Sequence, residues 1–126
     1  MPQTEIRVFK TADGDAPLVD WLETLRARFP IAYAKCLAAI LNLSQNGNTL
    51  RRPAADYLRD GIRELRTKSG RVNYRILYSF NGKNIAILTN GLTKTAKVPS
   101  ADIELAIERM ALVKKDANKY TAEFEL

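Results

Sequence analysis

The sequence contains no histidine, and it has only one cysteine and one tryptophan. The lack of histidine removes the commonest general base and the commonest zinc ligand. One cysteine cannot close an internal disulfide, and with scattered carboxylates it provides no structural zinc set. Any catalytic chemistry must therefore come from arginine, lysine, tyrosine or glutamate side chains, and neither a metal nor another cofactor is expected.

Long apolar runs are also missing from the chain. No segment approaches the ~20 consecutive apolar residues that a membrane span needs. The N-terminus, MPQTEIRVFK, lacks the apolar run of a signal peptide. We therefore expect a cytoplasmic protein. A length of 126 residues predicts one domain, spanning 1–126, because it allows one sizeable hydrophobic core and not two.

The single cysteine, Cys36, lies within the apolar run AKCLAAILNL. A nucleophilic cysteine is normally activated by a neighbouring base, and this chain has no histidine to supply one. A small residue on a buried helix face is therefore the better interpretation. Trp21 is predicted to be a core residue for a similar reason, because it belongs to an apolar helical stripe.

Positive charge is concentrated in one part of the chain. Residues 51–97 contain 11 Lys and Arg against 3 Asp and Glu, a local net charge of +8. The whole chain carries +6, so the remainder sums to −2. A field focused in this way indicates a polyanionic partner rather than general solubility.

The same stretch carries the clearest secondary-structure signals. Three runs rich in β-branched and aromatic residues, IRELRTK (62–68), RVNYRILYSF (71–80) and NIAILTNGL (84–92), are separated by Ser69-Gly70 and Asn81-Gly82. Asn-Gly between apolar alternations is a strong hairpin signal. We predict a three-stranded antiparallel meander.

The N-terminal half predicts a strand and two helices. EIRVFK (5–10) alternates as a short strand does. Asp15 as N-cap and Pro17 in the first turn mark a helix start, and Pro30 ends that helix and opens a second one, which runs to Asn46-Gly47. The predicted buried stripes are Leu18, Trp21, Leu22, Leu25 and Phe29 in the first helix, and Ala34, Leu37, Ala38, Leu41 and Ser44 in the second.

The remaining segments complete an α+β fold. Residues 48–61 are expected to be irregular, because Pro53 and Gly61 bracket them. Pro99 and Ser100 mark the start of a C-terminal helix, with a buried stripe of Ile103, Ala106, Ile107, Met110 and Val113. The tail, 116–126, is expected to be either flexible or a last edge strand. The expected order is strand, two-helix hairpin, meander, helix.

Alternation along the strands brings basic residues together. Glu64 and Arg66 share one face of their strand, and Arg75 faces opposite to Tyr74 and Ile76, which are predicted to point into the core. If Arg66 and Arg75 lie on the outer face of neighbouring strands, they converge with Glu64, and Lys94 and Lys97 can approach from the following loop. Such cations could hold a phosphodiester. Lys94 or Lys97 could act as base or acid, and Glu64 is the other base candidate unless it only orients an arginine. An ordinary solvated polar face fits the same periodicity equally well.

Five further cations are candidates for RNA binding: Arg63, Arg71, Lys68, Arg51 and Arg52. For Arg51 and Arg52, solvated loop arginines are the competing interpretation.

Three motifs in order carry a family resemblance. GIRELR (61–66), NYRILYSF (73–80) and ILTNGLTKTAKVPSADIELAIER (87–109), with the order of elements given above, resemble the RelE/ParE toxin superfamily, and most of all its phage-derived HigB-like branch. The resemblance covers about residues 5–115. It implies a toxin of a type II toxin–antitoxin pair.

Such toxins cleave messenger RNA in the ribosomal A site without a metal, and a helix-turn-helix, HigA-like antitoxin neutralises them. Through the resemblance, Arg75 matches the functional arginine of the family, and Arg66 occupies a basic position of the preceding strand. Lys94 and Lys97 match basic positions after the last strand. We expect Arg75→Ala to abolish growth inhibition and to leave the fold intact.

The chain departs from the pattern of the branch at two positions. Asn90 stands where the branch often has histidine, and Thr93 stands where it often has the first of two lysines. No tyrosine follows Lys97 until Tyr120, so the catalytic tyrosine of RelE-type members has no clear equivalent. Two alternatives therefore stay open: a ParE-like toxin that binds gyrase without cutting RNA, and a catalytically inactive nucleic-acid-binding phage protein.

Overall fold

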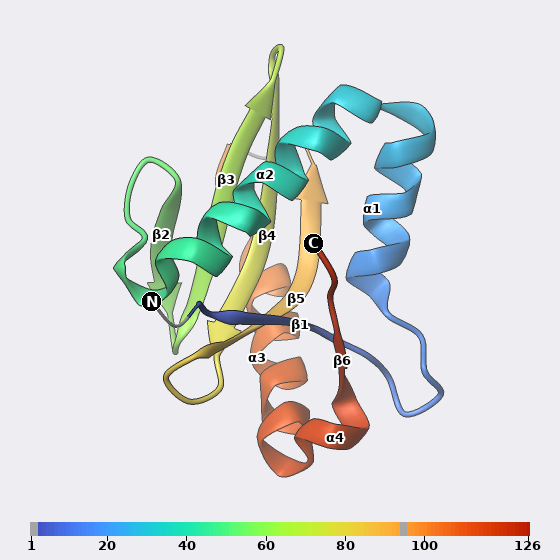
Figure 1. Cartoon of the computed structure of the whole chain (residues 1–126), viewed down its shortest axis with the longest axis vertical. Coiled ribbons are helices and arrows are strands. Elements are labelled where there is room, and N and C mark those ends of the chain that lie inside the picture. Colours follow the sequence, from blue (N-terminus) through green and yellow to red (C-terminus); the bar gives the residue numbers. More distant parts are fainter. Residues whose placement is uncertain (1–2, 94–95) are drawn as a thin grey trace.

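The computed structural model of the protein describes residues 3–93 and 96–126. Six strands form one mixed sheet in the order β2-β3-β4-β5-β1-β6. The elements are β1 (Glu5–Phe9), α1 (Pro17–Arg28), α2 (Pro30–Asn46), the 3-10 turn η1 (Gly47–Thr49), β2 (Ala55–Arg59), β3 (Ile62–Ser69), β4 (Val72–Phe80), β5 (Ile85–Thr93), α3 (Ser100–Lys115), α4 (Ala117–Tyr120) and β6 (Thr121–Glu123). Figure 1 shows α1 and α2 on one face of the sheet and α3 on the other. The predicted α+β class is confirmed.

The antiparallel meander is formed by β3, β4 and β5, as predicted. β1 adds parallel to β5, and the tail adds β6 antiparallel to β1, so the edge-strand alternative for the tail is the one observed. The prediction that 48–61 is irregular was wrong, because Ala55–Arg59 pairs with β3 as a further edge strand. The strand has only five residues and lies between Pro53 and Gly61. So short a run shows no clear alternation, and the sequence pattern did not predict it.

Both N-terminal helices have the predicted limits, but two details differ. The N-cap of α1 is Ala16, without a side-chain cap, while the Asp15 N–H donates to Thr11 Oγ1 at 3.2 Å. The predicted stripe of α2 was wrong except at Ser44: its buried residues are Ala32, Cys36, Ile40, Leu43 and Ser44. The face with Ile40 and Leu43 buries more apolar area than one built on Ala34 and Ala38, which are exposed.

The sheet separates two apolar cores. The first lies under α1 and α2 and includes Leu18, Cys36, Ile40, Tyr74 and Ile76. Trp21 packs against this core, as predicted, whereas Phe29 is 53% exposed and leaves the predicted stripe. The second core lies under α3 and includes Leu77, Ile87, Ile103, Ala106, Met110 and Val113. The predicted stripe of the C-terminal helix is therefore confirmed, with Ile107 only partly buried.

The second core occupies only part of the face that α3 covers. Leu77 and Ile87 are buried there, while Arg66 and Lys68, toward the β3–β4 turn, are exposed. The end of this face that lies nearest the β3–β4 turn is therefore open and basic. Among the residues described, none of the helices combines the length and the hydropathy needed to cross a membrane.

Candidate nucleic-acid interface

Arg66 on β3 and Arg75 on β4 are direct cross-strand partners. Directly opposed residues of an antiparallel pair point to the same face, so the two guanidinium groups share the face that α3 partly covers. Two like charges this close repel each other unless an anion lies between them. Glu64 supplies that anion: its Oε1 pairs with Arg75 Nη1 and lies 4.0 Å from Arg66 Nε.

The two arginines differ sharply in burial. Arg75 and Glu64 are 6% and 5% exposed, whereas the Arg66 side chain is 39% exposed. Arg75 Nη2 also donates to the carbonyl oxygen of Ala96 at 2.8 Å. Arg75 therefore joins the sheet to the loop that leads into α3, and Arg66 is the arginine that solvent reaches.

Other basic candidates lie near this pair. Lys97 is exposed and directly follows Ala96, so its backbone lies beside the Arg75 contact. Lys68 is exposed on the same face as Arg66, opposite Asn73 on β4. We call Arg66, Lys68, Asn73 and Arg75 the basic strip. Arg71 is exposed in the β3–β4 turn at the end of the strip, and Lys94 lies outside the described residues.

Three of the predicted RNA-binding arginines lie outside the strip, although Arg52 borders it through Asp56, the cross-strand partner of Glu64. Arg63 faces the α2 side of the sheet, with its guanidinium 5.3 Å from the ring centroid of Tyr57 and 5.6 Å from that of Phe80. Arg51 is exposed ahead of β2, and Arg52 Nη2 lies 2.8 Å from a carboxylate oxygen of Asp56. This hydrogen bond with Arg52 lowers the pKa of Asp56.

Several polar residues around the strip were not among the predicted site residues. Asn73 shares the face of Arg75, a placement that the alternation of β4 already gave. The contact to the Ala96 carbonyl had no sequence signal. Asn90 is 7% exposed, and its Nδ2 donates to the Asp102 carbonyl oxygen at 3.4 Å, while its Oδ1 accepts no hydrogen bond from the described residues.

Arg109 is a further half-buried cation that the sequence did not reveal. It reaches from α3 to the Thr89 carbonyl oxygen at 2.7 Å, and burial lowers the pKa of Arg109. Within residues 3–93 and 96–126, no cluster of three or more Cys, Asp or Glu side chains could hold a metal ion.

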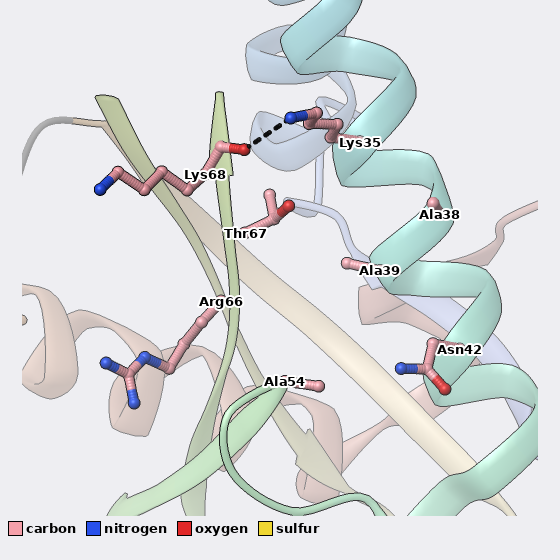
Figure 2. A pocket seen from close by; sticks show the side chains of 8 residues that line it. All are labelled: Lys35, Ala38, Ala39, Asn42, Ala54, Arg66, Thr67 and Lys68. Atoms are coloured by element: carbon pink, nitrogen blue, oxygen red, sulfur yellow. Dashed lines mark hydrogen bonds between the residues drawn. The ribbon is translucent and has the colours of Figure 1, made fainter. Parts of the chain in front are cut away.

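A hollow of about 400 Å³ runs between β3 and α2 beside the strip. Figure 2 shows Thr67 pointing across it toward α2, while the Arg66 and Lys68 side chains extend away from α2. Lys35 Nζ closes one end of the hollow by donating to the Lys68 carbonyl oxygen at 3.0 Å. The hollow is therefore on the helix side of β3, and the cationic groups of the strip do not point into it.

The comparison with protein families decides where the chain belongs. The model of the family described as "Phage derived protein Gp49-like (DUF891)" matches residues 20–111, from within α1 to within α3. The chain belongs to the Gp49-like family. Gp49-like proteins are a RelE-like toxin family of toxin–antitoxin systems, which suggests an antitoxin partner. No curated protein sequence matches the chain.

Proposed function

We propose that this Gp49-like protein is the toxin of a type II toxin–antitoxin pair, of the HigB-like branch, and that it cleaves messenger RNA on the ribosome. The observation that carries the proposal is the cross-strand placement of Arg66 and Arg75 around Glu64. Family membership supports a toxin. The open basic end of the sheet supports RNA as the substrate, because phosphate contacts dominate the affinity of nucleic-acid binding.

The proposed reaction is a transesterification within the RNA. The ribose 2′-oxygen loses its proton and attacks the adjacent phosphorus, and the bond from phosphorus to the 5′-oxygen breaks. The leaving 5′-oxygen takes up a proton, and the other product ends in a 2′,3′-cyclic phosphate. The protein must therefore stabilise extra negative charge on phosphorus and move two protons.

The burial of each group assigns its role in this reaction. Arg66 is exposed, and a guanidinium can grip two phosphate oxygens while staying charged, so it contacts the phosphate. Lys97, with Lys94, is the proposed group for proton transfer, following the basic positions of the family. Glu64 and Arg75 are buried against each other, so we assign them as positioning residues that hold Arg66 and the loop after β5.

The chain has no histidine to accelerate proton transfer on free RNA. Much of the acceleration would come from the ribosome, which holds the substrate in line for attack. The proposed neutralising partner is a helix-turn-helix, HigA-like antitoxin that covers the basic strip or an exposed sheet edge with acidic or apolar segments.

Brief induction of the protein in bacteria, followed by primer extension on messenger RNA, tests this proposal. Cuts that require translation of the message are the expected result. Intact messages with altered DNA supercoiling would favour a ParE-like toxin that acts on gyrase. Intact messages with normal supercoiling would favour an inactive nucleic-acid-binding protein, which the replacement of histidine by Asn90 would allow.

A further inference from the structure

We propose that an apolar pocket at the β3–β4 turn end of the sheet, built around Phe29 and Tyr74, holds an unstacked base of the RNA whose phosphates lie on the basic strip. This inference rests on the proposed function and adds a base subsite to it. Sequence-tolerant recognition of single-stranded RNA commonly combines a basic track with an aromatic surface on which a base stacks.

The pocket lies where α1, α2 and the meander meet. Its volume is about 690 Å³, within the range of ~300–1,000 Å³ that is typical of sites for small organic ligands. Its apolar lining comes from both sides: Phe29, Pro30, Ile31 and Ala32 from the helix junction, and Val72 and Tyr74 from β4. Arg28, Ser69 and Thr93 add polar groups that could orient a base.

Two side chains at this pocket are unusually exposed for their size. Phe29 is 53% exposed and Ile31 is 68% exposed, while Tyr74 in the pocket is only 4% exposed. Phe29 is the single residue between α1 and α2, so its backbone is held by two helix ends. The half-exposed Phe29 ring is therefore available for stacking without disturbing the core.

The register of the sheet places this pocket close to the basic strip. Arg66 pairs with Arg75 on the open face, and the next pair along the strands, Thr67 with Tyr74, faces the helix side, where Tyr74 lines the pocket. β1 pairs with β5 only as far as Leu88, so the last residues of β5 lie at an edge among the described strands. A single strand of RNA can pass around this edge, from phosphate contacts on one face to a base in the pocket on the other.

Charge distinguishes this pocket from another large apolar groove among the described residues. The only charged residue among the described lining of the Phe29 pocket is Arg28. The other groove, of about 850 Å³ between α1, α2 and the tail, is lined by Glu23, Glu123 and Glu125, which would repel a nucleic acid. Of the two, the Phe29 pocket is the one that suits RNA.

A binding assay that needs neither the ribosome nor cleavage tests the subsite. The probe is a short single-stranded RNA with 2′-O-methyl riboses and one 2-aminopurine, and its Kd is measured by fluorescence anisotropy. We expect Phe29→Ala to weaken binding about tenfold and to remove the protection of 2-aminopurine from acrylamide quenching. Phe29→Trp should retain the wild-type Kd and the protection of 2-aminopurine. Leu41 is 45% exposed and lines the acidic groove, so Leu41→Ala should change neither the Kd nor the protection.

The outcomes separate this inference from the proposed function. Wild-type affinity and quenching in Phe29→Ala would overturn the subsite even if the protein cuts messenger RNA. A protected base in a protein that makes no cuts would support the subsite and contradict the nuclease. If Phe29→Ala leaves RNA binding unchanged but weakens binding of the antitoxin, the pocket docks protein and the subsite is wrong. Ile31→Ser serves as the second variant if Phe29→Ala does not fold.

Discussion

Arg75 and Glu64 form an ion pair buried on the face of the sheet under the start of α3, and Arg75 also binds the carbonyl oxygen of Ala96. Arg75, for which the sequence resemblance predicts a functional role, therefore lies beneath the surface that a substrate would meet. Its position fixes the loop that carries Lys97 and holds the shared carboxylate near Arg66. Loss of Arg75 should act through the structure of the site.

Arg75→Ala should therefore abolish toxicity and also lower the free energy of unfolding. The sequence alone predicts that this variant keeps its fold intact, but the burial of Arg75 leads us to a different expectation. Removing one partner of a buried ion pair leaves the other charge uncompensated, at a cost of about 3–5 kcal/mol. Urea unfolding of the purified variant measures this change.

The control replaces both partners, as Arg75→Met with Glu64→Leu. Apolar replacement of a whole buried pair is often neutral, so this variant should regain much of the lost stability and still lack toxicity. An Arg75→Ala variant with the stability of the wild type would show that the pair has no structural role.

Arg66→Ala and Lys97→Ala should separate function from folding. Both side chains are exposed, so the free energy of unfolding of each variant should lie within about 0.5 kcal/mol of the wild-type value. Each lost phosphate contact should reduce the slope of log K against log salt by about 0.7 for single-stranded RNA. The matched control is Lys114→Ala, an exposed cation in the last turn of α3. An equal effect of Lys114→Ala would indicate general electrostatic attraction instead of a localised site.

Gly91→Ala should destabilise the contact between α1 and β5. A Cβ atom on Gly91 would lie 2.4 Å from atoms of the Trp21 ring, so the indole would have to move. Overpacking of this kind typically costs about 1–3 kcal/mol. Because Trp21 is the only tryptophan, its fluorescence reports the displacement directly. An unchanged emission spectrum and melting temperature would mean that the helix adjusts without cost.

Cys36 should be inert in the folded protein. Burial raises the pKa of its thiol to about 12, so the reactive thiolate is suppressed. The unfolded thiol ionises near pH 9, so the contribution of Cys36 to stability is present below that pH and is lost as the pH rises toward 12. Iodoacetamide should modify Cys36 only under unfolding conditions, and Cys36→Ala should keep its toxicity. Rapid labelling of the native protein would contradict this account.

The sequence predicted those parts of the fold that local patterns determine. The meander followed from two turn signals and period-two alternation, and the helix limits followed from Pro17, Pro30 and Gly47. The buried face of α2 and the strand at Ala55–Arg59 were missed, because both depend on which neighbour each element meets. A local stretch of sequence does not determine which neighbouring element it packs against.

For the site, alternation was enough to place Glu64, Arg66 and Arg75 on one face. It did not reveal that α3 covers only part of that face, so it could not distinguish the buried Arg75 from the exposed Arg66. Arg63 was an RNA-binding candidate on charge alone, and alternation already places it on the opposite face, where it packs over Tyr57 and Phe80.

The most direct test of the central claim uses purified ribosomes programmed with a defined messenger RNA. The account predicts that the wild-type protein cuts the message in the A site and leaves a 2′,3′-cyclic phosphate and a 5′-hydroxyl. Arg66→Ala, with a fold shown to be intact, should make no cut. An uncut message with the folded wild-type protein, or equal cutting by Arg66→Ala, would contradict the account.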